Sequence, residues 1–254
     1  MISELKSQVE SVLGGGRKVT ATVLSSPDQV DLIAEEITDA LEYQGIRNLM
    51  AEPDTLEDFY ASSAAYAGFR MGLCERHTDP YVCEQEDNQI YPSTRLLHLD
   101  FSPESLCATV RWLKSAKESR VDESIVDHGL GLGRNLVLET EYWDAVRNRI
   151  RNLVQSFGLR ITQVILTGSS ANDQRFKVAI REALKDWTTV GALDLLDQPC
   201  HGGESSMLLY ATARGAAEFA KRRQEGPVRC VETVKCKEVR RAIERELLTK
   251  KVEL

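Results

Sequence analysis

A short turn of small residues, Gly-Ser-Ser at 168–170, could do chemistry because of what surrounds it. It follows an apolar run at 161–166 and precedes a helical pattern that Asn172 or Asp173 is placed to cap. The N–H groups of such a turn and of a helix N-terminus can bind a phosphate or a sugar. The same pattern is also typical of an ordinary strand–helix connection in an α/β sheet, so both interpretations stay open.

The second residue that could take part in chemistry is Asp100, near the end of an apolar run at 95–101. A lone aspartate at the end of a strand is most often a turn residue. Ser102-Pro103-Glu104 joins this run to another at 105–113, which predicts a hairpin. No Ser/His/Asp or Cys/His arrangement stands out, so we assign no catalytic residue and expect no metal site.

The elements that position these residues follow from hydrophobic periodicity, which alternates between helical and strand patterns along the chain. Small residues at 62–68 and again around Gly215 permit close helix packing. Residues 70–93 and 186–206 have no clear period and are expected to be loops, the second with a short strand at 193–196. Helices are expected at 2–13, 27–43, 53–69, 139–157, 172–184, 207–223 and 235–252, and strands at 18–24, 46–50, 95–101, 105–113, 121–127 and 161–166.

Composition narrows the classes of function. The chain has 254 residues and a net charge of −7, so nucleic acid is not an expected partner. No apolar run approaches the roughly 20 residues of a membrane-spanning helix, and the first residues have no signal-peptide pattern. We therefore expect a cytoplasmic protein with no membrane partner.

Six cysteines are few for a disulfide scaffold of this length. Cys74 and Cys83, and likewise Cys230 and Cys236, could each close a small loop in an oxidising compartment. Neither pair has zinc-finger spacing. Reduced thiols without a function are the default expectation.

A family resemblance emerges from five fragments taken in order. They are VTATVLSSP at 19–27, SSAAYAGF at 62–69, LLHLDFSPESLCATV at 96–110, VILTGSS at 164–170 and ATARGAAEF at 211–219. This series resembles the ATPase domain of the seventy-kilodalton heat-shock chaperones, in the actin-like ATPase superfamily. In turn, the fragments look like its Pro-started helix, first crossing helix, second phosphate hairpin, adenosine motif and second crossing helix. The segment RGAAEFAKRR also resembles a group of fungal heat-shock-like proteins.

The departures from that family concern its phosphate-binding parts. Members hold ATP between two glycine-rich hairpins, because only glycine lets backbone N–H groups come so close. The sequence contains no DxGTT-like first hairpin and no counterpart of the family's catalytic lysine. In the second hairpin, Pro103 removes an N–H donor and Glu104 adds negative charge. Ser169 replaces the second glycine of the adenosine motif, and Asn172 replaces its adenine-stacking arginine.

Phosphoryl transfer depends on positioning and on neutralising phosphate charge, so these losses predict no useful ATP hydrolysis. The resemblance implies weak binding of ATP or ADP with Mg²⁺ at most, at Gly168, Ser169, Ser170 and Asp100. The expected function is therefore a heat-shock-chaperone-like, non-catalytic interaction or weak nucleotide-binding module. The alternative is an ATP-hydrolysing chaperone-like protein whose N-terminal lobe is missing from this chain. An unrelated α/β binding domain is the third reading.

The expected architecture is α/β, with a ribonuclease-H-like lobe whose mixed sheet is flanked by helices. Residues 1–70 would be the remainder of an incomplete first lobe with a crossing helix. A polar, cysteine-bearing loop at 71–93, the second lobe at 94–224 and a charged helical tail at 225–254 would follow. An incomplete lobe leaves apolar surface exposed, which predicts a protein partner or a homodimer.

Overall fold

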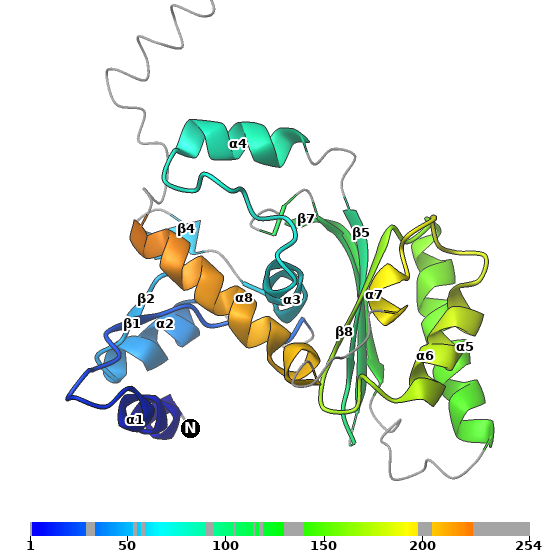
Figure 1. Cartoon of the computed structure of the whole chain (residues 1–254), viewed down its shortest axis with the longest axis horizontal. Coiled ribbons are helices and arrows are strands. Elements are labelled where there is room, and N and C mark those ends of the chain that lie inside the picture. Colours follow the sequence, from blue (N-terminus) through cyan, green and yellow to red (C-terminus); the bar gives the residue numbers. More distant parts are fainter. Residues whose placement is uncertain are drawn as a thin grey trace, which may run out of the picture.

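The chain folds as a mixed α/β protein in a computed structural model (Figure 1). The structure describes residues 2–28, 34–52, 55–56, 59–89, 94–103, 105–113, 115–116, 119–129, 140–197 and 205–225. The helices are α1 (Ile2–Leu13), α2 (Ala34–Tyr43), α3 (Ala61–Gly68), α4 (Pro80–Gln89), α5 (Thr140–Phe157), α6 (Gln174–Leu184), α7 (Asp194–Asp197) and α8 (Ser205–Glu225). The strands are β1 (Ala21–Thr22), β2 (Arg47–Asn48), β3 (Ala51–Glu52), β4 (Thr55–Leu56), β5 (Thr94–Phe101), β6 (Leu106–Leu113), β7 (Ser119–Gly129) and β8 (Gln163–Thr167).

The largest sheet has the strand order β7-β6-β5-β8. Strands β5, β6 and β7 pair antiparallel in chain order, and β8 joins the other edge of β5 in parallel. The expected hairpin is confirmed, because Phe101 pairs with Leu106 across Ser102 and Ser105. The mixed sheet flanked by helices confirms the α/β class predicted from the sequence.

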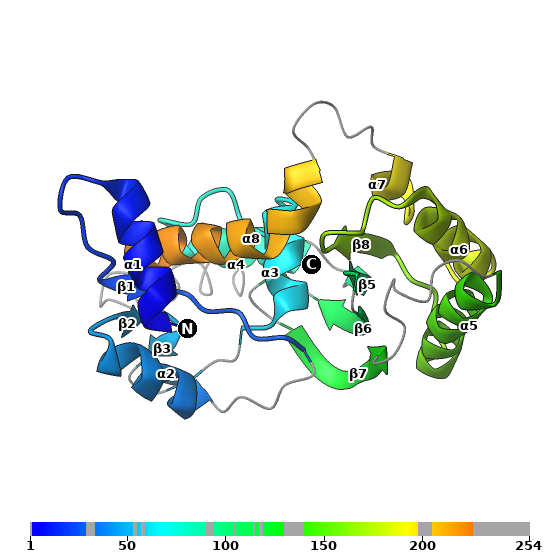
Figure 2. The ribbon, with the colours of Figure 1, turned by 90° about the horizontal axis from the view of Figure 1, so that it is seen from below.

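Helices cover both faces of this sheet (Figures 1 and 2). Helices α5 and α6 pack on one face, where Phe101 stacks on Phe176 with ring centroids 4.3 Å apart. Helices α3 and α8 pack on the other face, where Phe219 meets Phe59. Since side chains alternate between the faces of a strand, β5 contributes Leu97, Leu99 and Phe101 to the first core and Leu96 to the second.

Helices α3 and α8 approach so closely that glycine is required where they touch. A Cβ built on Gly215 would lie 1.7 Å from the backbone oxygen of Ala64, and one on Gly68 would lie 1.9 Å from that of Ala211. These are backbone atoms that no rotamer change can move. The close packing predicted from the small residues of both helices is therefore confirmed.

In the described residues before the main sheet, the strands form two small sheets. Strands β1 and β2 pair in parallel, and β3 pairs antiparallel with β4. The helix expected from 53 begins only at Ala61, because Glu52 pairs back on Thr55 and a helix cannot run through that pairing. The helix expected from Pro27 is also wrong at its start, since Asp28 lies in a turn.

Two further expectations about local structure are wrong. The strand expected at 193–196 is the short helix α7: Val164 N donates to Ala192 O, and the chain then coils through turn-type bonds instead of continuing along β8. The loop expected at 70–93 contains α4, which brings the two cysteines of this segment to a Cα–Cα distance of 5.1 Å. Cys74 and Cys83 form a disulfide, which contradicts the default of reduced thiols for this pair.

Several sequence-based expectations fall on undescribed parts of the chain. The helix expected at 235–252, with Cys230 and Cys236, lies outside the described residues, as does Glu104. Within the described ranges, no helix combines the length and the apolar character needed to cross a bilayer.

Candidate functional site

The residues singled out in the sequence come together at one edge of the main sheet. Asp100 on β5 pairs in register with Thr167 on β8, and Gly168 follows directly. The hydroxyl of Thr167 donates a hydrogen bond to Asp100 Oδ2 over 2.6 Å. The end of β5 and the turn after β8 therefore lie side by side.

The turn at 168–170 is closed onto the end of β5. Gly168 has a φ of +100°, and a Cβ built on it would lie 2.3 Å from the backbone oxygen of Phe101. Only glycine fits this position. The N–H of Ser170 donates to that same Phe101 oxygen over 3.0 Å, so this donor is already used within the protein. Ser169 is exposed, whereas Ser170 is buried.

The N-terminus of α6 is capped from within the chain. Asp173 has the extended backbone of an N-cap residue, and its Oδ1 accepts from Arg175 N over 2.9 Å. The ammonium of Lys177 donates to Asn172 Oδ1 over 2.8 Å. The Asp173 carboxylate places negative charge where a phosphate would need positive charge. An ordinary strand–helix connection accounts for all of these contacts.

A row of polar side chains lies on the sheet face under α3, and apart from Asp100 the sequence analysis did not identify its members. Leu97, Leu99 and Phe101 point into the opposite core, so the alternate residues of β5 face α3. The cross-strand pairs His98–Thr109 and Asp100–Cys107, together with Asp100–Thr167, extend the set across three strands. We call these residues the polar row: His98, Asp100, Cys107, Thr109, Arg111 and Thr167.

Three members of the polar row form a directed hydrogen-bond chain. Because Thr167 gives its proton to the Asp100 carboxylate, its oxygen accepts from His98 Nε2 over 2.8 Å, which places the imidazole proton on Nε2. Burial lowers the pKa of His98 below its usual value; Asp28 and Asp100 oppose the shift, and Arg111 adds to it. His98 is therefore a neutral donor. Burial, helped by Asp100 and Asp28, raises the pKa of the free thiol of Cys107.

A buried ion pair joins the polar row to α3. Arg111 Nε lies 2.9 Å from Asp28 Oδ1, with both side chains almost wholly buried. Asp28 also accepts from the N–H of Ser62 over 3.1 Å and from its hydroxyl over 2.5 Å. It therefore caps α3 from a distant segment, since the local N-cap Tyr60 makes no side-chain cap. The Arg111 guanidinium stacks on the Tyr60 ring, 3.9 Å from its centroid.

One signal in the sequence could have revealed this pair. Arg111 alternates along β6 with Cys107, Thr109 and Leu113, so these residues share one face of the strand. A charged residue on a buried strand face rarely lacks a partner of opposite charge, so the pattern predicts an acidic residue nearby. Nothing in the sequence identified that acid as Asp28, which follows Pro27 in a pattern typical of a helix start.

The residues at this edge do not fit a magnesium–nucleotide complex well. The Asp100 carboxylate is engaged by Thr167, and the hairpin beyond it carries Pro103 where an N–H donor would be needed. Throughout the described part of the chain, no three His, Cys, Asp or Glu residues gather so that they could hold a metal ion. No protein-family model matches the chain, and no curated protein matches it.

Proposed function

We propose that this chain is a heat-shock-chaperone-like protein with an actin-like ATPase fold and degenerate phosphate loops. In this proposal it acts as a non-catalytic interaction module that binds nucleotide weakly at most. The strand order β7-β6-β5-β8, with a parallel strand added beside an antiparallel meander, supports a ribonuclease-H-like lobe. The glycine-dependent crossing of α3 and α8 supports the family's pair of crossing helices.

One observation carries the non-catalytic part of the proposal: the polar groups at the sheet edge bond to one another. Asp100 accepts from Thr167, Thr167 accepts from His98, and Ser170 N–H is bonded to Phe101 O. A nucleotide would have to displace these bonds, and each buried group left unpaired would cost about 1–3 kcal/mol. The polar groups of the site therefore already have hydrogen-bond partners when no ligand is bound.

The interaction part of the proposal is supported by α1. None of its residues is buried, and its apolar side chains Leu5, Val9 and Val12 are exposed by 53%, 47% and 88%. Such a helix face favours a protein partner or a second copy of the chain. Sedimentation velocity should detect self-association that Leu5→Glu/Val9→Glu reduces, whereas a compact monomer with no protein partner speaks against this part.

The non-catalytic part is tested by phosphate release from Mg-ATP under steady-state conditions. We expect no release above buffer for the wild-type chain, and no difference between it and Asp100→Asn. Asparagine keeps an acceptor for Thr167 but removes the charge that could hold Mg²⁺. Steady release that Asp100→Asn abolishes would show an active site at this edge and overturn the proposal.

A further inference from the structure

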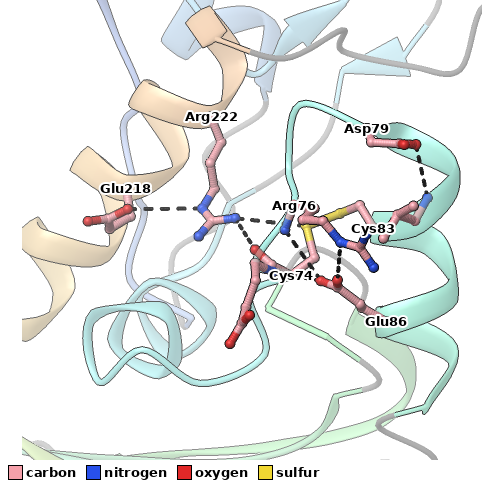
Figure 3. The surroundings of a disulfide bond; sticks show 9 residues. Cys74, Arg76, Asp79, Cys83, Glu86, Glu218 and Arg222 are labelled. Carbon is pink, nitrogen blue, oxygen red and sulfur yellow. Dashed lines mark hydrogen bonds and ion pairs between the residues drawn. A yellow bond between two sulfur atoms is a disulfide. The ribbon is translucent and has the colours of Figure 1, made fainter.

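The disulfide Cys74–Cys83 lies against the last turns of α8 (Figure 3). It joins the segment after α3 to α4, and the proposed function makes no use of it. Arg222 of α8 donates from Nη1 to the backbone oxygen of Cys74. The same Nη1 lies 3.8 Å from Cys74 Sγ. A second contact nearby joins His77 Nε2 to Glu225 Oε2 over 2.9 Å.

The two sulfurs of this disulfide have different surroundings. Cys74 is buried, with 7% of its surface exposed, whereas Cys83 on α4 is only half-buried. A thiol from solution therefore reaches Cys83 more easily than Cys74. The charge of Arg222 acts on the other sulfur, and the carboxylate of Glu218 is 4.0 Å from Arg222 Nε, at the outer limit of an ion pair.

This asymmetry favours one direction of thiol–disulfide exchange, with attack on Cys83 and departure of Cys74. The reaction is faster when the attacked sulfur is accessible and when the departing thiol has a low pKa. A neighbouring arginine lowers the pKa of a cysteine because it stabilises the thiolate. Cys83 is the more accessible of the two cysteines, and Cys74 lies beside Arg222.

We propose that Cys74–Cys83 is an exchangeable regulatory disulfide and that Cys83 is its site of S-thiolation by a low-molecular-weight thiol of the glutathione type. The thiolate of that reagent attacks Cys83 Sγ and forms a mixed disulfide. The Cys74–Cys83 bond breaks, and its electron pair leaves on Cys74 as a thiolate that Arg222 stabilises. A second thiolate attacks the reagent's sulfur in the mixed disulfide and releases Cys83 as a thiolate. In total, two thiols are oxidised to one disulfide while Cys74 and Cys83 are reduced.

The exchange acts on the attachment of α4. Besides the disulfide, Glu86 of α4 accepts from Glu75 N over 2.7 Å and pairs with Arg76 over 3.4 Å. These contacts are exposed to solvent, and such pairs add little to stability. Opening the disulfide therefore removes the covalent cross-link between α4 and the segment that Arg222 holds on α8.

The test treats the full chain with glutathione, blocks free thiols with an alkylating reagent and maps both modifications by peptide mass spectrometry. At early times we expect glutathione on Cys83 and alkylation on Cys74, and at late times alkylation on both cysteines. Glutathione found mainly on Cys74, or a disulfide that glutathione leaves intact, would overturn the proposal. This readout uses the wild-type chain and does not depend on any variant folding.

The role of Arg222 is tested by the rate of exchange. Arg222→Gln should slow opening about threefold, because the departing Cys74 thiolate loses the positive charge beside it. Arg222→Lys keeps the charge and should keep most of the rate. Arg223→Gln removes the same charge one residue further along α8 and serves as the matched control. Equal slowing by Arg222→Gln and Arg223→Gln would rule out the specific role of Arg222.

Discussion

The close crossing of α3 and α8 predicts that Gly215→Ala destabilises the protein. In an exposed helix interior this change should stabilise the protein by about 1 kcal/mol, because alanine has the higher helix propensity. At Gly215 the added methyl would lie 1.7 Å from Ala64 O and 2.8 Å from Gly68 N, both backbone atoms. Relief requires that the two helices separate. Overpacking a core typically costs about 1–3 kcal/mol, and a backbone clash belongs at the upper end.

The expected net loss is therefore about 2 kcal/mol, the upper overpacking figure less the propensity gain. For a chain of this size that corresponds to a fall in Tm of roughly 4–8 °C. Urea denaturation followed by circular dichroism measures the loss. Ala217→Gly, on the exposed side of the same helix, calibrates the propensity contribution and should cost about 1 kcal/mol. A Gly215→Ala protein as stable as the wild type, or more stable, would refute the tight crossing.

Two further predictions concern His98 and Arg111, two buried ionisable residues of the polar row. Because burial lowers the folded pKa of His98, the unfolded chain binds a proton below about pH 6.5 that the folded chain does not, so stability should fall as the pH falls. The stability should change with pH by at most about 1.4 kcal/mol per pH unit. Urea denaturation midpoints between pH 7.5 and 5.5 should fall less for His98→Gln than for the wild type. Equal falls for both proteins would contradict the role of His98. Arg111→Met should cost about 3–5 kcal/mol because it leaves Asp28 as an unpaired buried charge. Asp28→Asn in the same protein should recover part of that loss in a double-mutant cycle, and strictly additive losses would show that the two side chains do not interact.

The sequence predicted best those parts of the fold whose information is local. Helix α5 has a long, regular apolar period, and strand β5 coincides with an apolar run. Helix α1 ends at Leu13, directly before three glycines. The small residues of α3 and α8 predicted close packing, because glycine and alanine let the backbone of a neighbouring helix come near. Helix α4 was missed because its polar sequence has no apolar stripe.

The candidate site was predictable only in part, for a similar reason. Asp100 and Gly168 were singled out from their places at strand ends, and parallel pairing of β5 with β8 brings them together. Asp28 is different: it caps Ser62, which is 34 residues away, and pairs with Arg111 on another strand. Such partners are set by tertiary packing, which no local pattern encodes. The disulfide likewise depended on a helix that the sequence did not reveal.

The central proposal is that the sheet edge at Asp100 and Gly168 derives from a nucleotide site whose polar groups are now bonded to one another. Isothermal titration of the chain with Mg-ATP tests this most directly. The account predicts no saturation below about 1 mM, equivalent to a binding free energy no stronger than about −4 kcal/mol. Saturable binding in the micromolar range that Asp100→Asn weakens would contradict it.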